Sequence, residues 1–262
     1  MRLGFSGEVV DYYHKYRRGY PSPVIDALVA ALQLRDDDIV VDLGCGTGQL
    51  TLPLARRVRA VVGMDPEPDM LERARDVAGK QDTTNVTWIL GADSDIPALG
   101  ALLDSPTLGA VTIGQALHWM DPDTLFNNLA PLVRNGGGVA ILTNGSPAWL
   151  QDTTWSKSLR SFLEGWLVRP LTFTCGSDGA SQQRYAASLR RAGFHVSETT
   201  VEYTAEIDLE HLIGGVYSAL STDHLPAPEQ RPEFAEQIRQ ALHPVDRFSE
   251  HVRVMMLIGQ KN

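Results

Sequence analysis

The sequence predicts an α/β fold in which helices cover a mainly parallel β-sheet. Between residues 39 and 145, short β-branched runs alternate with segments of helical periodicity, the pattern of βαβ units around a parallel sheet. A glycine-rich turn, residues 44–48, follows the first of these runs. Two longer β-rich runs, residues 195–207 and 250–260, come late in the chain. We expect these two to pair antiparallel at the edge of the sheet.

The elements of the alternating region follow from residue spacing. Strands are expected at residues 39–43, 60–65, 86–90, 109–114 and 138–144. Between them, apolar residues recur with a period near 3.6 and predict helices that bury one face on the sheet. The last of these helices is expected to carry Leu125, Leu129, Leu132 and Val133. The "NGGG" stretch at 135–138 is expected to end it in a left-handed turn, which glycine favours.

The alternation stops after residue 145. Residues 149–168 are rich in tryptophan and predict a helix, and further helices are expected at about 182–192, 208–220 and 229–242. We therefore expect a single domain, residues 1–262, whose cap is formed by about 1–35, 146–180 and 208–242.

Composition narrows the classes of partner. With 43% hydrophobic residues the chain can fill a full core, whereas a net charge of −9 would repel a phosphate backbone, so nucleic acid is not an expected partner. No apolar run approaches the roughly 20 residues that cross a bilayer, and residues 1–7 lack a basic and apolar leader. We expect a cytoplasmic protein without membrane contact. Cys45 and Cys175 lie outside any CxxC or Cys/His pattern, which disfavours a disulfide framework or a structural zinc site.

The turn "VVDLGCGTGQL" (residues 40–50) favours a cationic ligand. A dinucleotide site uses G-x-G-x-x-G so that backbone amides face a pyrophosphate. Here the spacing is G-x-G-x-G, Gln49 stands where the third glycine would be, and Asp42 adds a negative charge. S-adenosylmethionine carries an ammonium, a sulfonium and no phosphate, so Asp42 can attract its amino acid end. Asp65 ends the second strand, where a carboxylate can accept both ribose hydroxyls.

At this point the sequence resembles the class I S-adenosylmethionine-dependent methyltransferases over nearly its whole length. Four stretches have the family's order and spacing: "VVDLGCGTG" (40–48), "VVGMDPEPDMLERAR" (61–75), "GADSDIP" (91–97) and "ALHWMD" (116–121). The resemblance implies the family's Rossmann-like seven-stranded sheet with an antiparallel edge strand. It also implies S-adenosylmethionine as cofactor and S-adenosylhomocysteine as product.

The resemblance also implies roles for individual residues. Asp42, Gly44, Cys45 and Gly46 would face the methionyl part of the cofactor, and Asp65 the ribose. Cofactor contacts are further implied for Pro66, Met70, Ala92, Asp93 and Gln115, with Asp93 meeting the adenine amine. Many relatives place that acid directly after the glycine, where this chain has Ala92. Asp95 or a backbone amide is therefore the alternative to Asp93.

The N-terminal segment "VVDYYHKYRRGYPSP" (9–23) resembles a lid that covers the cofactor in this family. Tyr12 and Tyr16 are four residues apart and share one helix face. We expect Tyr16 and Arg18 to contact the cofactor, with Arg17 as the alternative to Arg18. Tyr12 and Tyr20 are candidate catalytic residues. The alternative is that these tyrosines only cover apolar surface.

The "QALHWMD" stretch (115–121) follows the fourth strand, whose end would face the sulfonium. His118 is a candidate general base because imidazole titrates near neutral pH. A structural role is the alternative, since the His-Trp pair recurs among relatives with different substrates. Tyr13, Trp119 and Trp149 are expected to line the substrate pocket.

These observations predict methyl transfer from S-adenosylmethionine to an amine or hydroxyl of a small molecule, in secondary metabolism. The alternatives are carboxylate methyl ester formation, as in trans-aconitate methylation, and cyclisation of the cofactor's aminobutyl chain. The histidines have no ligand-like spacing with carboxylates, so no metal is expected. The sequence is compatible with a homo-oligomer.

Overall fold

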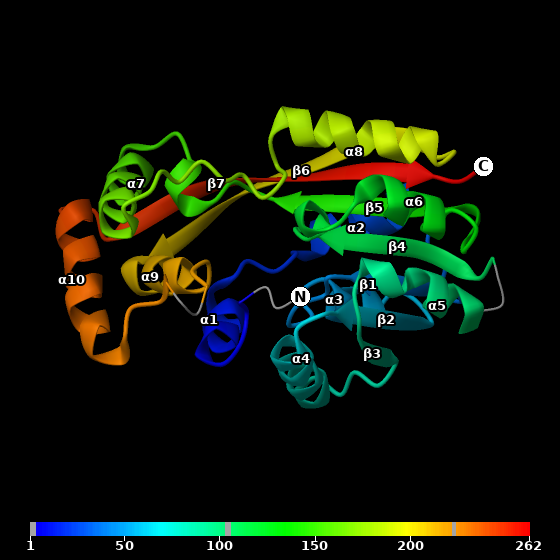
Figure 1. Ribbon diagram of the computed structural model, residues 1–262, viewed down its shortest axis with the longest axis horizontal. Helices are drawn as coiled ribbons and strands as arrows, with labels where there is room; N and C mark the ends of the chain where they lie inside the picture. Colours follow the sequence, from blue (N-terminus) through cyan, green and yellow to red (C-terminus); the bar gives the residue numbers. More distant parts are fainter. Residues whose placement is uncertain (1–3, 103–105, 222–223) are drawn as a thin grey trace.

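The computed structural model describes residues 4–102, 106–221 and 224–262. Its centre is a seven-stranded sheet of order β3-β2-β1-β4-β5-β7-β6 (Figure 1). The strands are β1 (Ile39–Leu43), β2 (Ala60–Asp65), β3 (Val86–Leu90), β4 (Leu108–Gly114), β5 (Val133–Asn144), β6 (His195–Asp208) and β7 (Arg247–Gln260). β1 to β5 pair in parallel, and β7 pairs antiparallel with both β5 and β6. The predicted α/β class, the parallel strands and the antiparallel pair at the edge are all confirmed.

The strand order reverses beside β1. From β1 the chain proceeds outward to β2 and β3, and then returns to place β4 on the other side of β1. Ligands of open α/β sheets bind beyond the carboxyl ends of the strands at such a reversal. The glycine-rich turn after β1 and the residues after β4 both lie at this point.

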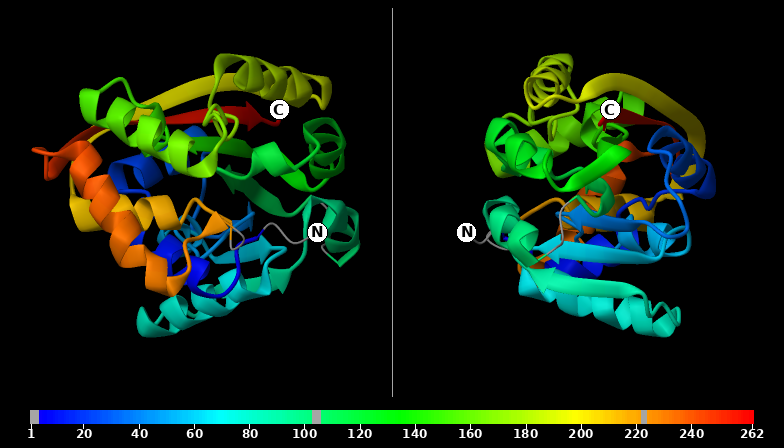
Figure 2. Two further views of the ribbon diagram at one scale, coloured as in Figure 1. Left: turned by 60° about the vertical axis from the view of Figure 1, so that its left-hand side comes forward. Right: turned by 90° about the vertical axis from the view of Figure 1, so that its right-hand side faces the viewer.

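Helices cover both faces of the sheet (Figures 1 and 2). On one face, α2 (Ser22–Ala31) and α3 (Thr51–Ala55) bury Val24, Leu28 and Leu54. On the other, α5 (Ile96–Leu102), α6 (Pro122–Leu129) and α8 (Gly179–Arg191) enclose a core that includes Phe126 and Tyr185. α4 (Pro68–Lys80) packs beside β2 and β3. Among the described residues, no helix is both long and apolar enough to cross a membrane.

The "NGGG" stretch does not end a helix, contrary to the prediction. α6 ends at Leu129, and residues 135–138 lie inside β5, where the register with β4 shifts. The reason is close packing between backbones. A Cβ on Gly137 would stand 2.3 Å from the Gly109 oxygen, and one on Gly138 would stand 2.4 Å from the Gly259 oxygen. Only glycine allows the neighbouring strands to approach this closely.

The cap is carried by the two longest strands. β6 and β7 pair over their full lengths, but β5 reaches only from Gly138 to Asn144 along β7. The β6–β7 ribbon therefore extends beyond the sheet, where α7 (Thr154–Leu167), α9 (Leu209–Tyr217) and α10 (Arg231–Leu242) gather around it (Figure 1). Phe248 of β7 is buried among these helices. Residues 22–31, which were expected in the cap, form α2 on the sheet instead.

Short 3-10 turns connect these elements. They are η1 (Asp93–Asp95), η2 (Leu117–Trp119), η3 (Ala148–Leu150) and η5 (Pro228–Gln230). η1 follows β3 and η2 follows β4, so both lie at the carboxyl edge of the sheet.

The first helix, α1 (Glu8–Tyr16), docks on the cap helix α9. The Tyr16 ring lies flat against Gly214, where a Cβ would stand 2.3 Å from the ring carbons. The Tyr16 hydroxyl donates a hydrogen bond to Glu210 Oε1 at 3.0 Å. A glycine on α9 thus permits the contact that holds α1 beside the cap.

We expect Gly214→Ala to destabilise the protein by about 1–3 kcal/mol, because the added methyl group forces the Tyr16 ring from its seat. Urea unfolding of the variant measures this difference. Gly215→Ala on the same helix is the matched control, since its methyl group meets no atom within 4 Å. That control should gain up to about 1 kcal/mol from helix propensity. Equal stabilities for the two variants would contradict the seating of α1 on Gly214.

Candidate functional site

The glycine turn is fastened to the end of the neighbouring strand. The Gly44 and Cys45 amides donate to the Met64 carbonyl at 2.8 and 3.1 Å, and the Gly46 amide donates to Asp65 Oδ2 at 2.8 Å. Gly44 and Gly46 have φ angles of 71° and 55°, which side chains disfavour. The turn is therefore held open by hydrogen bonds within the protein, with its backbone at the carboxyl edge of the sheet.

Asp42 lies beneath this turn and is buried. Its two carboxylate oxygens accept hydrogen bonds from the Thr51 hydroxyl at 2.6 Å and from the Thr112 hydroxyl at 2.8 Å. Burial raises the pKa of Asp42 to about 6, although the two threonine hydroxyls act against that shift. The expected carboxylate is thus present, but its oxygens already have partners that the sequence motif did not reveal.

Asp65 is the second buried carboxylate of the site. It accepts a hydrogen bond from the Gly46 amide through Oδ2 and a second one from the Glu67 amide, at 2.9 Å, through Oδ1. Burial raises the pKa of Asp65 to about 6, and the two amides oppose the shift. Each carboxylate oxygen can accept a second hydrogen bond, so Asp65 can still receive hydroxyl groups from a ligand.

A surface suited to a flat ring lies next to Asp65. Pro66, Met70, Ala92 and Asp93 all line the same cavity. Asp95, the alternative acid, accepts the Ala92 amide at 2.9 Å and is absent from the cavity lining. This geometry favours Asp93 over Asp95 as the acid that faces a ligand.

Cys45 behaves as a buried residue of the turn. Burial raises the pKa of its thiol well above the usual value, and the Asp65 and Asp42 carboxylates reinforce the shift. A protonated thiol is a poor nucleophile. Cys45 and Cys175 are both free.

Several residues of the N-terminal segment that were predicted to belong to the site line the cavity. Those that line the cavity are Tyr13, Tyr16, Arg17, Arg18 and Tyr20. Burial raises the pKa of Tyr13 and of Tyr20. The Tyr20 hydroxyl lies against Gly114 at the end of β4, where a Cβ would be 2.7 Å away.

Tyr12, a candidate catalytic residue, does not line the cavity. Its ring contacts that of Tyr217 with a centroid distance of 5.1 Å, and Arg231 Nη1 donates to its hydroxyl at 3.4 Å. The helical spacing placed Tyr12 and Tyr16 on one face, but that face packs on α9 and α10. Tyr12 therefore belongs to the apolar packing of the cap, the alternative reading of its sequence position.

Arg18 lines the cavity but is already paired. Its guanidinium donates to both oxygens of Glu250, through Nη2 at 2.7 Å and Nε at 3.2 Å, and Nη1 donates to the Asn144 carbonyl at 2.8 Å. Glu250 is only 2% exposed. Such a bidentate pair is geometrically specific, so the expected contact with a cofactor carboxylate would have to share Arg18 with Glu250.

Sequence reasoning missed Glu250. It lies in β7, where alternating polar residues read as an ordinary solvated strand face. Gln151 Nε2 also donates to Glu250 Oε1 at 2.7 Å. The signal that could have revealed it is the need of a partly buried arginine for a carboxylate partner, but the sequence does not show which acid the fold brings near.

The residues after β4 also line the cavity. Gln115 has a φ of 55°, and its Oε1 is buried without a hydrogen-bond partner among the described residues. Trp119 is 50% exposed, and its ring lies 5.0 Å from that of His118. Burial lowers the pKa of His118 to about 4, and the Cys175 backbone partly offsets the shift. His118 is consequently a neutral and weak base near pH 7.

A second element that the sequence did not reveal is the loop of residues 169–175. This loop connects α7 to α8 and lines the cavity. Its Phe173 ring packs edge-on against His118 at 5.4 Å and is 61% exposed. Apolar residues in a segment between two predicted helices were the available signal. Since Phe173 and Trp119 both pack on the His118 ring, they give this part of the cavity an aromatic wall. Trp149 also lines the cavity.

The glycine turn, Asp42, Asp65, Arg18, Gln115 and His118 border one cavity of about 740 Å³. It extends from the glycine turn, past Gln115 and His118, to the cap residues Leu171 and Leu212. This volume lies within the usual range for small-molecule sites. In the described residues no cluster of three or more histidine, cysteine or acidic side chains is arranged to hold a metal ion.

We expect the His118 ring to remain neutral at pH 5, where a histidine with an ordinary pKa near 6.5 is mostly protonated. Folding lowers the pKa of His118, so the neutral ring makes its full contribution to the free energy of unfolding above about pH 6.5. This contribution is lost as the pH falls toward about 4. An NMR titration of the histidine ring signals measures this directly, and His118→Asn identifies the signal. Protonation of His118 with a midpoint near 6.5 would contradict its burial.

Comparison with known proteins places this geometry in a family. Residues 40–137 match a family model described as "Methyltransferase domain". An "uncharacterized methyltransferase" of Mycobacterium bovis is 33% identical over 246 residues, which cover 93% of this chain and 88% of that protein. The fold is similar to that of an Anaeromyxobacter dehalogenans protein provisionally described as a type II methyltransferase, with 22% identity, coverage of 93% and 95%, and a TM-score of 0.58. It is also similar to a geranyl diphosphate methyltransferase in complex with S-adenosylmethionine, with 16% identity, coverage of 90% and 84%, and a TM-score of 0.50. The chain belongs to the class I S-adenosylmethionine-dependent methyltransferases.

Proposed function

We propose that this protein transfers the methyl group of S-adenosylmethionine to an amine or hydroxyl of a small molecule, and releases S-adenosylhomocysteine. The observation that carries the proposal is the single cavity of about 740 Å³, which joins the glycine turn to an aromatic wall. One end of the cavity suits the cofactor and the other an acceptor. The net charge of −9 favours a small molecule over nucleic acid.

The cofactor end fits S-adenosylmethionine on three counts. Asp42 and Asp65 are buried carboxylates with raised pKa values, so nearby positive charge on a ligand would favour their ionised forms. The unpartnered Gln115 Oε1 can accept a hydrogen bond from an ammonium. Gly46 admits a ligand close to the turn, because it lines the cavity without a side chain.

The roles of the chain's own residues follow from these positions. Asp65 would hold the ribose hydroxyls, Pro66 and Met70 the adenine faces, and Asp93 its exocyclic amine. Gly44, Cys45 and Gly46 would border the methionyl part, with Asp42 beneath them. The solved relative bound to S-adenosylmethionine supports the choice of cofactor.

The acceptor end would be formed by Trp119, Trp149 and Phe173, with Tyr20 and His118 beside it. Tyr13, predicted for the substrate pocket, lies beside Gly46 and would therefore cover the cofactor end. S-adenosylmethionine supplies a methyl group on a positively charged sulfur, which is already activated for transfer. The walls then have to orient the acceptor in line and exclude water, which can supply a large part of the rate acceleration. The face of Trp119 can also stabilise a cationic amine.

The weak basicity of His118 limits the acceptors that suit this site. A base with a pKa of about 4 removes a proton from an alcohol poorly. An amine that enters in its neutral form can accept the methyl group first and release its proton afterwards. Within the proposed class, an amine acceptor or an acidic hydroxyl therefore fits the site better than an aliphatic alcohol.

A carboxylate acceptor is the second candidate, because the cavity lining includes Arg169. A guanidinium could orient an acceptor carboxylate, and ester formation requires no base. The two candidates differ in the stability of the product, since mild alkali cleaves a methyl ester but leaves an N-methyl group or a methyl ether intact.

We expect the protein, incubated with S-adenosylmethionine and a small-molecule extract of its source organism, to yield S-adenosylhomocysteine and a species heavier by one methyl group. Mass spectrometry identifies both, and mild alkali then tests the new bond. Release of methylthioadenosine without a methylated product would overturn the proposal in favour of cyclisation of the aminobutyl chain.

We expect Asp65→Ala to weaken S-adenosylmethionine binding by more than tenfold, because two ribose hydroxyls lose their acceptor and the Gly46 amide loses its anchor. Isothermal titration calorimetry measures the affinity, and urea unfolding confirms that the variant is folded. Asp76→Asn, an exposed position on α4, is the control and should bind as the unmodified protein does. Near-normal affinity of Asp65→Ala would refute the ribose assignment.

A further inference from the structure

Two aromatic side chains of the large cavity expose half or more of their surface. Trp119 is 50% exposed and Phe173 is 61% exposed. Single exposed apolar residues are normal on a protein surface, but these two line one cavity and pack on one ring, that of His118, at 5.0 and 5.4 Å. Apolar and aromatic rings that line a shared cavity are typical of small-molecule sites. We call the rings of Trp119, His118 and Phe173 the aromatic surface.

The segment that carries Phe173 is held on both sides. On the side of α7, the Leu171 amide donates a hydrogen bond to Glu164 Oε1 at 2.8 Å. On the side of α8, the Thr174 hydroxyl donates to Asp178 Oδ2 at 2.7 Å. Phe173 is therefore exposed in a segment whose neighbours on both sides are hydrogen-bonded to the flanking elements.

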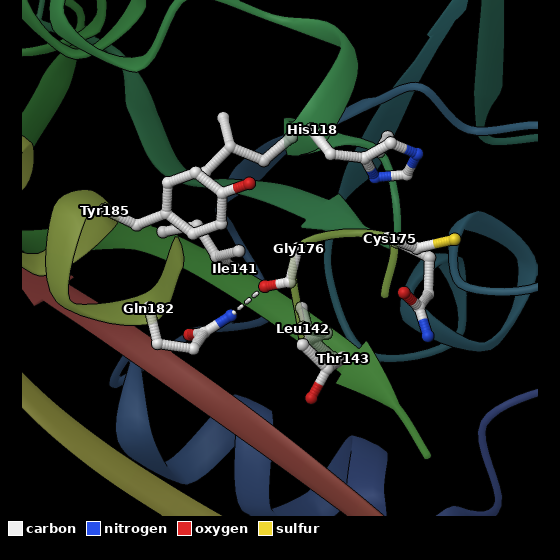
Figure 3. A pocket seen from close by; sticks show the side chains of 11 residues that line it. His118, Ile141, Leu142, Thr143, Cys175, Gly176, Gln182 and Tyr185 are labelled. Atoms are coloured by element: carbon white, nitrogen blue, oxygen red, sulfur yellow. Dashed lines mark hydrogen bonds between the residues drawn. The ribbon is translucent and has the colours of Figure 1, made fainter. Parts of the chain in front are cut away.

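The turn that follows, at Cys175 and Gly176, rests on α8 (Figure 3). Gln182 Nε2 donates a hydrogen bond to the Gly176 carbonyl at 2.7 Å. A Cβ on Gly176 would stand 2.5 Å from the Tyr185 hydroxyl, so glycine is needed for this contact. The side chains of α8 thus hold the loop in place before any ligand is bound. A surface ordered in advance costs less conformational entropy when a ligand binds.

The aromatic surface begins beside the glycine turn. A Cβ on Gly44 would stand 2.4 Å from the Cβ of Ala116, so the turn is in direct contact with the residue that precedes η2. His118 and Trp119 belong to η2. A ring that packs on the aromatic surface would therefore lie close to the methionyl part of a cofactor bound at the turn.

The aromatic surface is uncharged at neutral pH. Trp119 and Phe173 have no ionisable group, and burial lowers the pKa of His118 so that its ring is neutral near pH 7. An aromatic ring of a ligand can pack on such rings edge-to-face or offset-stacked. Each such contact strengthens binding by about two- to tenfold beyond the effect of the buried area. The surface therefore favours an aromatic ligand over an aliphatic one of the same shape.

We propose, on the basis of the function proposed above, that the acceptor carries its amine or hydroxyl on an aromatic ring, which packs on Trp119, His118 and Phe173. The lone pair of the ring-bound nitrogen or oxygen would form a bond to the methyl carbon. The bond from that carbon to sulfur would break, and its electron pair would stay on sulfur. The proton of the amine or hydroxyl would pass to solvent water.

Attachment to an aromatic ring also suits the weak basicity of His118. An aromatic amine is neutral at pH 7, because its lone pair is delocalised into the ring. A phenol has a pKa near about 10, as the tyrosine side chain does, and it loses its proton far more readily than an aliphatic alcohol. Both groups can therefore accept a methyl group without a strong base beside them.

The binding of two probes of similar shape tests the inference without any methyl transfer. We titrate 2-naphthol and its saturated analogue decahydro-2-naphthol into the protein saturated with S-adenosylhomocysteine, and NMR of the probe signals gives both dissociation constants. The preference for 2-naphthol should fall by about two- to tenfold in Phe173→Leu and in Trp119→Leu. Trp166→Leu removes an exposed aromatic ring outside the cavity lining and is the control, in which the preference should stay unchanged.

An unchanged preference in both cavity variants would overturn the aromatic class of acceptor, and so would a lack of binding of 2-naphthol at millimolar concentration. A failure of the proposed function is recognised separately, because S-adenosylhomocysteine itself would then not bind in calorimetry.

The methylated species from the extract provides a second test. After chromatographic separation from the adenine-containing products, it should show the ultraviolet absorption of an aromatic ring. A methylated species without this absorption would overturn the aromatic class and leave methyl transfer in place. Release of methylthioadenosine without any methylated species would overturn the proposed function, and the aromatic class of acceptor with it.

Discussion

The site depends on the hydrogen bonds between the glycine turn and the end of β2. Three successive amides, those of Gly44, Cys45 and Gly46, donate to the Met64 carbonyl and the Asp65 carboxylate. These bonds fix the turn without help from a ligand. They also hold Asp65 beside the turn, where burial raises its pKa although the amide hydrogen bonds act against that shift. The same contacts that shape the pocket therefore prepare it for a ligand that carries hydroxyl groups and positive charge.

A second constraint joins the lid to the cap. The β6–β7 ribbon extends beyond the sheet and carries Glu250 to the cavity, where this acid binds Arg18 of the N-terminal segment. Tyr16 of α1 is seated on Gly214 of α9. The segment that covers the cavity is therefore anchored at both the ribbon and the cap. A displacement of α9 or of the ribbon would also displace the lid and change the shape of the acceptor end.

The sequence predicted the sheet because its signals are local. β-branched runs and a glycine turn identify strands and the ligand edge whatever the distant contacts are. The "NGGG" stretch was misread because glycine both ends helices and permits close strands, and only the neighbours Gly109 and Gly259 decide between the two. Likewise, the spacing of Tyr12 and Tyr16 gave a common helix face but not the element on which that face packs. The Arg18–Glu250 pair joins residues that are 232 positions apart, so no local pattern could predict it.

The environment of His118 bears on how a methyltransferase with this site can work. A side chain chosen from the sequence as a base is held in a place that lowers its pKa to about 4, because two aromatic neighbours and the surrounding wall exclude water from the ring. The ring packs between Trp119 and Phe173 in the wall of the cavity, and a packed wall can orient an acceptor without acting as a base. Since the donor is already activated, orientation is the larger requirement of the reaction. The loss of basicity at His118 is thus consistent with catalysis in which the cavity aligns the acceptor and the departing proton leaves after methyl transfer.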